Sequence, residues 1–147
     1  MAPPWSESPR TSVERYARAV GAEEAVTRLV DLLDGAVLDA PLGEVLAGPA
    51  SRAVLEGGAG GPQGYWVRVW ALRGLLYVWR DVATPAVIAA CADSSWRARE
   101  MALKVCARRR LDEALEAAST CQDDDVARVR AAAQRVLRVL TEEGTAP

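Results

Sequence analysis

The sequence has 147 residues, of which 50% are hydrophobic and 26% charged, as is usual for one soluble globular domain. It contains no histidine, which excludes histidine-based catalytic triads, imidazole acid–base chemistry and histidine metal ligands. Three cysteines, Cys91, Cys106 and Cys121, are widely spaced at apolar helical positions without a C-x-x-C pair. We therefore expect buried structural thiols, no disulfide framework, no metal site and no cofactor.

No run of residues is long and apolar enough to span a membrane, and the N-terminus lacks the pattern of a signal peptide. These features predict a cytoplasmic protein with no membrane partner. The basic residues are nearly all arginine, Lys104 being the only lysine, a bias typical of a GC-rich bacterial genome.

Charge is distributed unevenly along the chain, although the net charge is only −2. Residues 62–110 carry 9 basic and 3 acidic side chains, whereas residues 1–61 carry 5 basic and 9 acidic ones. Residues 111–147 carry 4 basic and 8 acidic side chains. Either the two signs neutralise each other across the fold, or the basic middle attracts an acidic partner.

The first third of the chain predicts a disordered lead followed by short helices. Residues 1–10 hold three prolines and read as disordered, and residues 11–34 have helical apolar spacing with a break or kink at Gly21. Gly35 is the expected C-terminal stop, and residues 38–56 predict one or two short helices interrupted by Pro and Gly. Residues 57–64 form a Gly-rich loop, which lacks the pattern of a phosphate-binding loop.

The remainder of the chain predicts alternating helices and turns. A helix is expected over residues 65–80, with a core stripe formed by four residues. These are Val67, Ala71, Leu75 and Val78. Further helices are expected over residues 84–92, 95–108, 111–121 and 125–140. In the helix over 111–121, Ala114, Leu115 and Ala118 are expected to face inward. Thr84-Pro85, Asp93-Ser94 and Asp123-Asp124 supply the helix starts.

Three of these helices are similar to one another at an offset of 31 residues. The matching columns are Val67, Ala98 and Val129; Arg68, Arg99 and Arg130; Ala71, Ala102 and Ala133; and Leu75, Cys106 and Leu137. Small apolar residues recur in one helical stripe because they let neighbouring helices approach closely. Each unit of a short helix, a turn and a longer helix cannot bury its apolar face alone, so stacking is expected.

The spacing of Asp93 before Ala98-Arg99, and of Asp124 before Val129-Arg130, resembles the HEAT-repeat superfamily, including its shorter HEAT-like units. Those units also occur in phycobilin lyase subunits. The resemblance implies that Asp93 and Asp124 cap the second helices and that Arg99 and Arg130 pair with Asp residues of adjacent units in a ladder. The helix over 65–80 departs from the pattern, because Pro62 stands where the Asp belongs.

The fold class we expect is all-α: a right-handed α-solenoid of about three HEAT-like helical hairpins over residues 65–140, with an N-terminal helical cap over residues 11–56. Residues 11–147 are thus predicted to form a single helical-repeat domain.

An aromatic cluster is the sharpest local feature of the sequence. Its members are Tyr65, Trp66, Trp70, Tyr77 and Trp79. These rings either pack the N-terminal helices onto the repeats or, with Arg73 on the same face as Trp66, Trp70 and Tyr77, offer an aromatic–arginine surface to a peptide or a base.

The second candidate surface is basic and lies on the second helices of the repeats. Its residues include Arg97, Lys104, Arg108, Arg128, Arg135 and Arg138. In stacked repeats the second helices line the concave side, where these side chains would meet phosphates. The same set also contains Arg99, Arg130, Arg109 and Arg110. The alternative is a structural role, in which Arg99 and Arg130 belong to the arginine ladder and Arg108–Arg110 interact with the dipole at the end of their helix.

The functional hypothesis is a non-catalytic module that binds another protein. The expected contact residues are Trp66, Trp70, Arg73, Tyr77, Arg97, Met101, Arg108 and Arg128. The alternative is a nucleic-acid-binding protein, with or without base chemistry. For the base chemistry, Trp96-Arg97-Ala98-Arg99-Glu100 is similar to a segment of the alkylpurine DNA glycosylases. Trp96 and Glu100 would then supply the aromatic and the carboxylate that such base chemistry needs.

Overall fold

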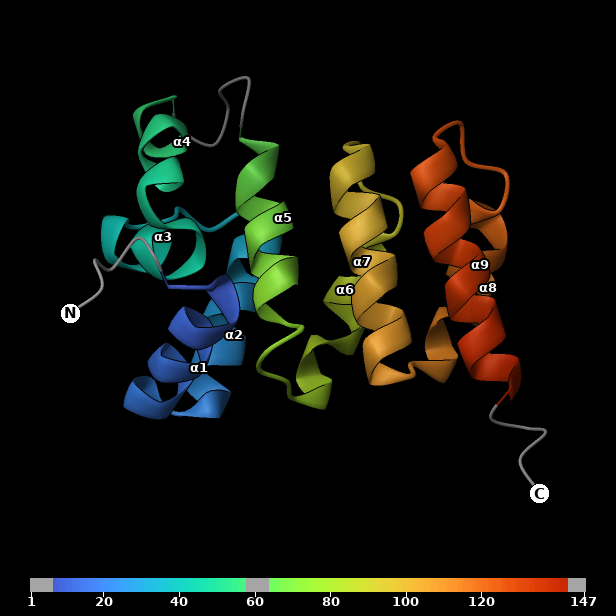
Figure 1. Cartoon of the computed structure of the whole chain (residues 1–147), viewed down its shortest axis with the longest axis horizontal. Coiled ribbons are helices and arrows are strands. Elements are labelled where there is room, and N and C mark those ends of the chain that lie inside the picture. Colours follow the sequence, from blue (N-terminus) through green and yellow to red (C-terminus); the bar gives the residue numbers. More distant parts are fainter. Residues whose placement is uncertain (1–6, 58–63, 143–147) are drawn as a thin grey trace. The chain divides into compact units, whose positions relative to one another are not determined.

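A computed structural model describes residues 7–57 and 64–142, and over these ranges the chain is helical and contains no strand (Figure 1). The all-α class is therefore confirmed. Within these described ranges, no helix combines the length and the apolar character needed to cross a membrane. The chain divides into two compact units, residues 1–83 and 84–147. The boundary lies inside the segment predicted to form repeats.

The first unit begins with two helices that one glycine separates. Helix α1 is Pro9–Val20, and helix α2 is Ala22–Leu33. Gly21 between them has φ = 94°, a left-handed value that side chains disfavour, so the predicted break is confirmed. Helix α1 starts two residues before the expected residue 11, because Ser8 caps it by accepting a hydrogen bond from the Thr11 N–H at 3.2 Å. Residues 1–6 of the expected disordered lead, including Trp5, lie outside the described ranges.

Helix α2 ends at a left-handed glycine, as predicted. Gly35 has φ = 103°, and its N–H donates to the Leu32 carbonyl at 3.2 Å. The Ala36 N–H donates to the Asp31 carbonyl at 2.9 Å, which completes the paired bonds of a Schellman motif. Carbonyls that would otherwise lack partners at the end of α2 are thereby satisfied.

Two short helices follow, α3 (Ala40–Ala47) and α4 (Ser51–Gly57), joined by a 3₁₀ turn over Gly48–Ala50. They confirm the expectation of one or two short helices. Asp39 caps α3 by accepting from the Leu42 N–H at 2.8 Å. Most of the Gly-rich loop that follows, residues 58–63, lies outside the described ranges.

Helix α5 is Tyr65–Gly74, so the expected helix over 65–80 was six residues too long. After Gly74 the chain tightens into turns, in which the Leu76 and Tyr77 N–H groups donate to carbonyls three residues earlier. The predicted core stripe is nevertheless confirmed, since Val67, Ala71, Leu75 and Val78 are all buried. Helix α5 packs against α2 and α3 within the first unit.

Gly74 lies where α5 packs closely against its neighbours α2 and α3. A Cβ atom placed there would lie 3.0 Å from Leu29 Cδ1 and 3.4 Å from Leu46 Cδ2. Both leucines are themselves buried, on α2 and α3. We expect Gly74→Leu to destabilise the protein by about 1–3 kcal/mol through overpacking, measured by urea unfolding. The matched control is Gly57→Leu, because a Cβ atom placed at Gly57 meets nothing within 4 Å. The urea concentration at the midpoint of unfolding should hardly change in this variant.

The second unit contains two pairs of helices, each with a short and a longer member. The first pair is α6 (Thr84–Ala90) and α7 (Trp96–Arg109); the second is α8 (Leu115–Cys121) and α9 (Ala127–Glu142). A 3₁₀ turn, Asp112–Ala114, precedes α8. Helix α7 packs against both α6 and α9, and α8 packs against α9 (Figure 1).

The recurring small residues form the core of the second unit. Ala98, Ala102 and Val105 on α7 have no exposed surface, and neither do their counterparts Val129, Ala133 and Val136 on α9. The expected inward position of Leu115 was wrong, since this side chain is 45% exposed. Ala114, Ala118 and Cys121 fill the buried stripe at spacings of four and three, and Leu115 lies one residue, about 100° of helix rotation, away from that stripe.

The three thiols are buried and unpaired, as expected. Although they are 15 residues apart in sequence, the three cysteines lie close together in space. Cys91 Sγ lies 3.9 Å from Cys106 Sγ, and Cys121 Sγ donates to the Cys91 carbonyl at 3.4 Å. The hydrogen bond with Cys106, together with burial, raises the pKa of the Cys91 thiol. Neutral thiols at these positions behave as small apolar side chains.

Candidate interaction surface on helices α7 and α9

Two Asp-containing turns position the long helices of the second unit in the same way. Asp93 Oδ1 accepts from the Ser95 N–H at 2.8 Å, and Asp124 Oδ1 accepts from the Val126 N–H at 2.9 Å. Arg99 Nη1 donates back to the Asp93 carbonyl at 2.9 Å, and Arg130 Nη1 donates to the Asp124 carbonyl at 2.6 Å. The recurrence of Asp and Arg at an offset of 31 residues is thus also a recurrence of geometry.

Arg99 joins the two turns by a bidentate ion pair. Its Nε donates to Asp124 Oδ2 at 2.8 Å and its Nη2 to Asp124 Oδ1 at 3.1 Å. The hydrogen bond from Arg99 lowers the pKa of the Asp124 carboxyl, and the same bond raises the pKa of Arg99. These contacts engage the Arg99 fork, so Arg99 connects the α6–α7 pair to the α8–α9 pair.

Beside this ion pair, Trp96 is surrounded by charged side chains from both long helices. The guanidinium carbons of Arg97 and Arg128 lie 4.5 and 5.4 Å from its ring centroid, within cation–π range. Arg128 Nε also donates to Glu100 Oε2 at 2.9 Å, and Lys104 Nζ lies 3.9 Å from the same oxygen. The Trp96 ring and the Glu100 carboxylate are therefore both engaged by basic side chains.

A shallow groove of about 240 Å³ runs between α7 and α9 next to this cluster. Ala131 and Ala132 of α9 contribute small apolar side chains to its lining. The other four lining residues are charged, three of them basic and one acidic: Lys104, Arg128, Arg135 and Glu100. The groove therefore combines small apolar side chains with a lining of net positive charge.

The predicted contact residues on α7 lie along this surface. Arg97 and Arg108 are exposed, and Met101 is half-buried between them. Spacings of four, three and four residues place Arg97, Met101, Lys104 and Arg108 on one helix face. Arg97 and Arg128, predicted from sequence, are brought together around Trp96. Arg135 belongs to the basic set predicted from sequence. It lines the groove because α7 packs on α9.

The contact residues predicted on α5 belong to the first unit and do not form an open surface. Trp70 is only 6% exposed, so its proposed role as a binding aromatic is corrected to a core role. It stacks on Trp66 with ring centroids 6.2 Å apart and planes inclined by 22°. Arg73 Nη2 donates to the Leu46 carbonyl at 2.6 Å, and burial lowers the pKa of the Arg73 guanidinium.

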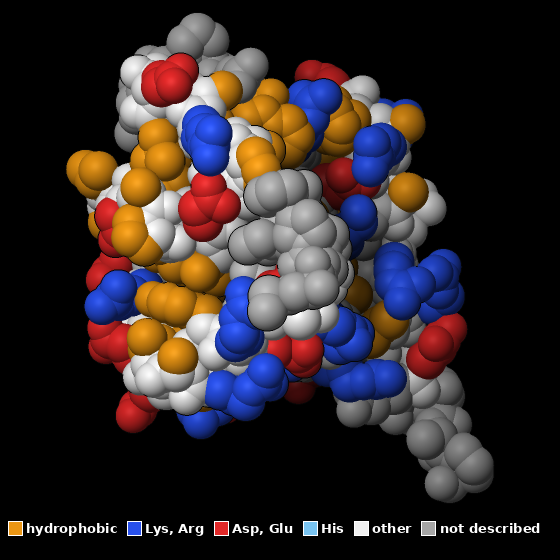
Figure 2. All heavy atoms as spheres, turned by 60° about the vertical axis from the view of Figure 1, so that its left-hand side comes forward, with side chains coloured by type: hydrophobic (Ala, Val, Ile, Leu, Met, Phe, Trp, Pro, Cys, Tyr) orange, Lys and Arg blue, Asp and Glu red, His pale blue; other side chains and the backbone are white. Residues whose placement is uncertain are grey.

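Tyr77 was predicted to share a helical face with Trp66 and Trp70. It lies beyond the end of α5, so it does not share that face. The Arg10 guanidinium on α1 lies 5.5 Å from the Tyr77 ring centroid. The side from which α1 and α3 are seen is not dominated by one type of side chain: hydrophobic, basic and acidic groups are interspersed there (Figure 2).

Comparisons with protein-family models, with curated proteins and with solved structures found no match to this chain.

Proposed function

We propose that this chain is a non-catalytic protein–protein interaction module, whose α6–α7 and α8–α9 pairs are HEAT-like repeats of a right-handed solenoid. The support for the repeat assignment is the duplicated Asp–Arg geometry, together with the buried Ala98/Val129 and Ala102/Ala133 columns. Three unpaired thiols suit the reducing cytoplasm that we propose as its location.

The surface proposed for binding is the groove between α7 and α9, and its partner is an acidic segment of another protein. The observation that carries this proposal is the groove itself, which is lined by two alanines together with Lys104, Arg128 and Arg135. The small alanine side chains let a peptide approach closely, and the basic side chains favour carboxylate groups through steering and paired contacts. Arg97 and Arg108 extend the same charge along α7.

Nucleic acid is the second candidate, because the same basic side chains suit phosphates. The contacts of Trp96 weigh against it, because two guanidinium groups approach the ring, which is therefore not left open to stack on a base. The glycosylase hypothesis meets a further obstacle, because Glu100 accepts a hydrogen bond from Arg128 and lies near Lys104.

We expect Lys104→Glu/Arg135→Glu to weaken partner binding by about tenfold or more, since each change replaces an attraction to acidic groups by a repulsion. The measurement is a nuclease-treated pull-down from the native host, with retained proteins identified and then titrated in purified form. Arg18→Glu/Arg52→Glu is the matched control, because it makes the same charge change at exposed positions of α1 and α4.

Retention of an acidic protein by the wild type and the control, and its loss from the groove variant, would support the proposal. Equal retention by all three proteins would reject the groove. Binding of a DNA or RNA oligonucleotide at low salt, lost in the groove variant and falling steeply as salt is raised, would favour the second candidate instead.

A further inference from the structure

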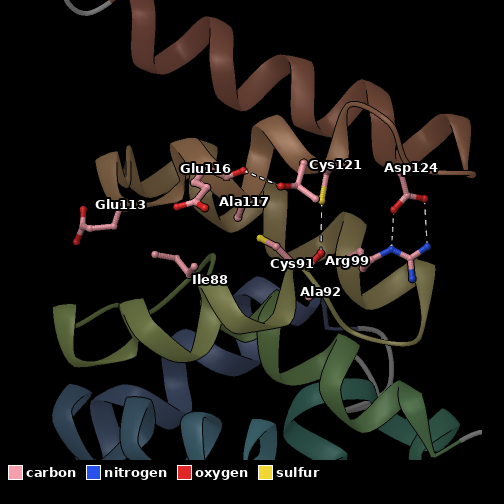
Figure 3. A pocket seen from close by; sticks show the side chains of 10 residues that line it. Ile88, Cys91, Ala92, Arg99, Glu113, Glu116, Ala117, Cys121 and Asp124 are labelled. Atoms are coloured by element: carbon pink, nitrogen blue, oxygen red, sulfur yellow. Dashed lines mark hydrogen bonds and ion pairs between the residues drawn. The ribbon is translucent and has the colours of Figure 1, made fainter.

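A separate pocket of about 420 Å³ lies between α6 and α8 in the second unit (Figure 3). Ile88 and Ala92 line it from α6 and the turn after it, and Ala117 lines it from α8. The volume falls within the range of about 300–1,000 Å³ that small-molecule sites occupy. None of its lining residues belongs to the groove between α7 and α9.

The pocket is lined at depth by sulfur atoms. Cys91 and Cys121 contribute to the lining while only 3% and 5% of their surfaces are exposed. Burial raises the pKa of the Cys121 thiol. The same thiol donates its proton in a hydrogen bond to the Cys91 carbonyl. Neutral thiols are soft and polarisable, and sulfur makes favourable contacts with aromatic rings. The interior therefore suits an apolar, preferably aromatic, body.

The charged groups at the pocket are not equivalent. Arg99 and Asp124, at one end, neutralise each other through their bidentate pair. Glu113 and Glu116 come from the 3₁₀ turn and the first turn of α8, and both are exposed (Figure 3). Over the described residues, neither carboxylate makes an ion pair. The charge left available at the pocket is consequently negative.

We propose that the α6–α8 pocket binds a small organic amine, with its apolar body on the alanine and sulfur lining and its ammonium group beside Glu113 and Glu116. The apolar body gains by leaving water, and a cation beside Glu113 and Glu116 gains from two carboxylates that form no ion pair within the described part of the chain. This site is independent of the proposed protein-binding groove.

The test compares three probes of the same size and different charge: 4-phenylbutylamine, 4-phenyl-1-butanol and 4-phenylbutyrate. Each is titrated into the full-length protein and followed by amide chemical shifts. We expect the amine to bind about tenfold more tightly than the carboxylate, with the alcohol between them. The largest shifts should fall on α6 and α8.

Glu113→Gln/Glu116→Gln should reduce amine binding to the level of the alcohol. Glu14→Gln/Glu23→Gln makes the same chemical change at two exposed glutamates of α1 and α2 and should leave amine binding unchanged. Ala117→Trp should block all three probes by filling the pocket, whereas Lys104→Glu/Arg135→Glu should bind the amine as the wild type does. The last comparison separates this proposal from the protein-binding one.

A second measurement needs no variant. Bound amine should slow the alkylation of Cys91 and Cys121 by N-ethylmaleimide, and the carboxylate probe at the same subsaturating concentration should slow it much less. Equal binding of amine and carboxylate, shifts centred outside α6 and α8, or the absence of amine binding would each overturn the proposal.

Discussion

Replacing Trp70 by alanine is expected to lower the free energy of unfolding by about 3–5 kcal/mol. The ring is only 6% exposed and stacks on Trp66, so its removal deletes a large buried apolar surface and leaves a cavity. The measurement is chemical unfolding followed by circular dichroism, with the midpoint and slope fitted separately.

Trp66→Ala is the control for this experiment, because Trp66 has the same side chain but is half-buried. A clearly smaller loss of stability is expected there. The opposite pattern would be informative: if Trp70→Ala left stability unchanged and abolished partner binding, the ring would belong to a binding surface after all. That outcome would contradict the core position of Trp70.

Asp124→Asn removes the carboxylate of the Arg99–Asp124 pair and is expected to lower the free energy of unfolding by about 2 kcal/mol. Asp124 accepts two hydrogen bonds from Arg99 and one from the Val126 N–H, so one substitution weakens both the connection between helix pairs and the start of α9. Arg99→Ala should cost at least as much, because Arg99 also donates to the Asp93 carbonyl.

A double-mutant cycle isolates the ion pair from these other contacts. The double variant Arg99→Ala/Asp124→Asn should be more stable than the sum of the single losses predicts, since the shared interaction is lost only once. Strict additivity would show that the pair contributes nothing. Arg28→Ala/Glu24→Gln provides a comparison, because that pair joins exposed side chains on α2 and should show little coupling.

The same pair predicts a dependence of stability on pH. Arg99 lowers the pKa of Asp124 in the folded protein, so the folded state holds the Asp124 proton less tightly than the unfolded state does. The resulting stabilisation is fully present above the pKa of an unfolded aspartate, about 4, and is lost as the pH falls through the lower folded value. The stability difference between wild type and Asp124→Asn should therefore be constant near neutral pH and shrink in acid.

Local sequence patterns predicted the helices well because the signals that start and stop them are short-range. The left-handed glycines Gly21 and Gly35, and the Asp side chains in the turns before α7 and α9, act within a few residues of their own positions. The helix over 65–80 was overestimated because its apolar pattern continues past Gly74, although the backbone tightens into turns there. Apolar periodicity reports burial, and turns after a helix can be buried too.

What the sequence determined by itself is the all-helical class and the buried stripe of small residues, since both depend on spacing within one helix or turn. The 31-residue recurrence of Asp and Arg is likewise visible in the sequence alone. The tertiary structure alone decided which side chains remain available. Arg73 is engaged by a carbonyl 27 residues away, and three cysteines spaced 15 apart meet at one place. A helical period identifies the apolar face of a helix, but what covers each aromatic or charged side chain depends on helices that are distant in sequence.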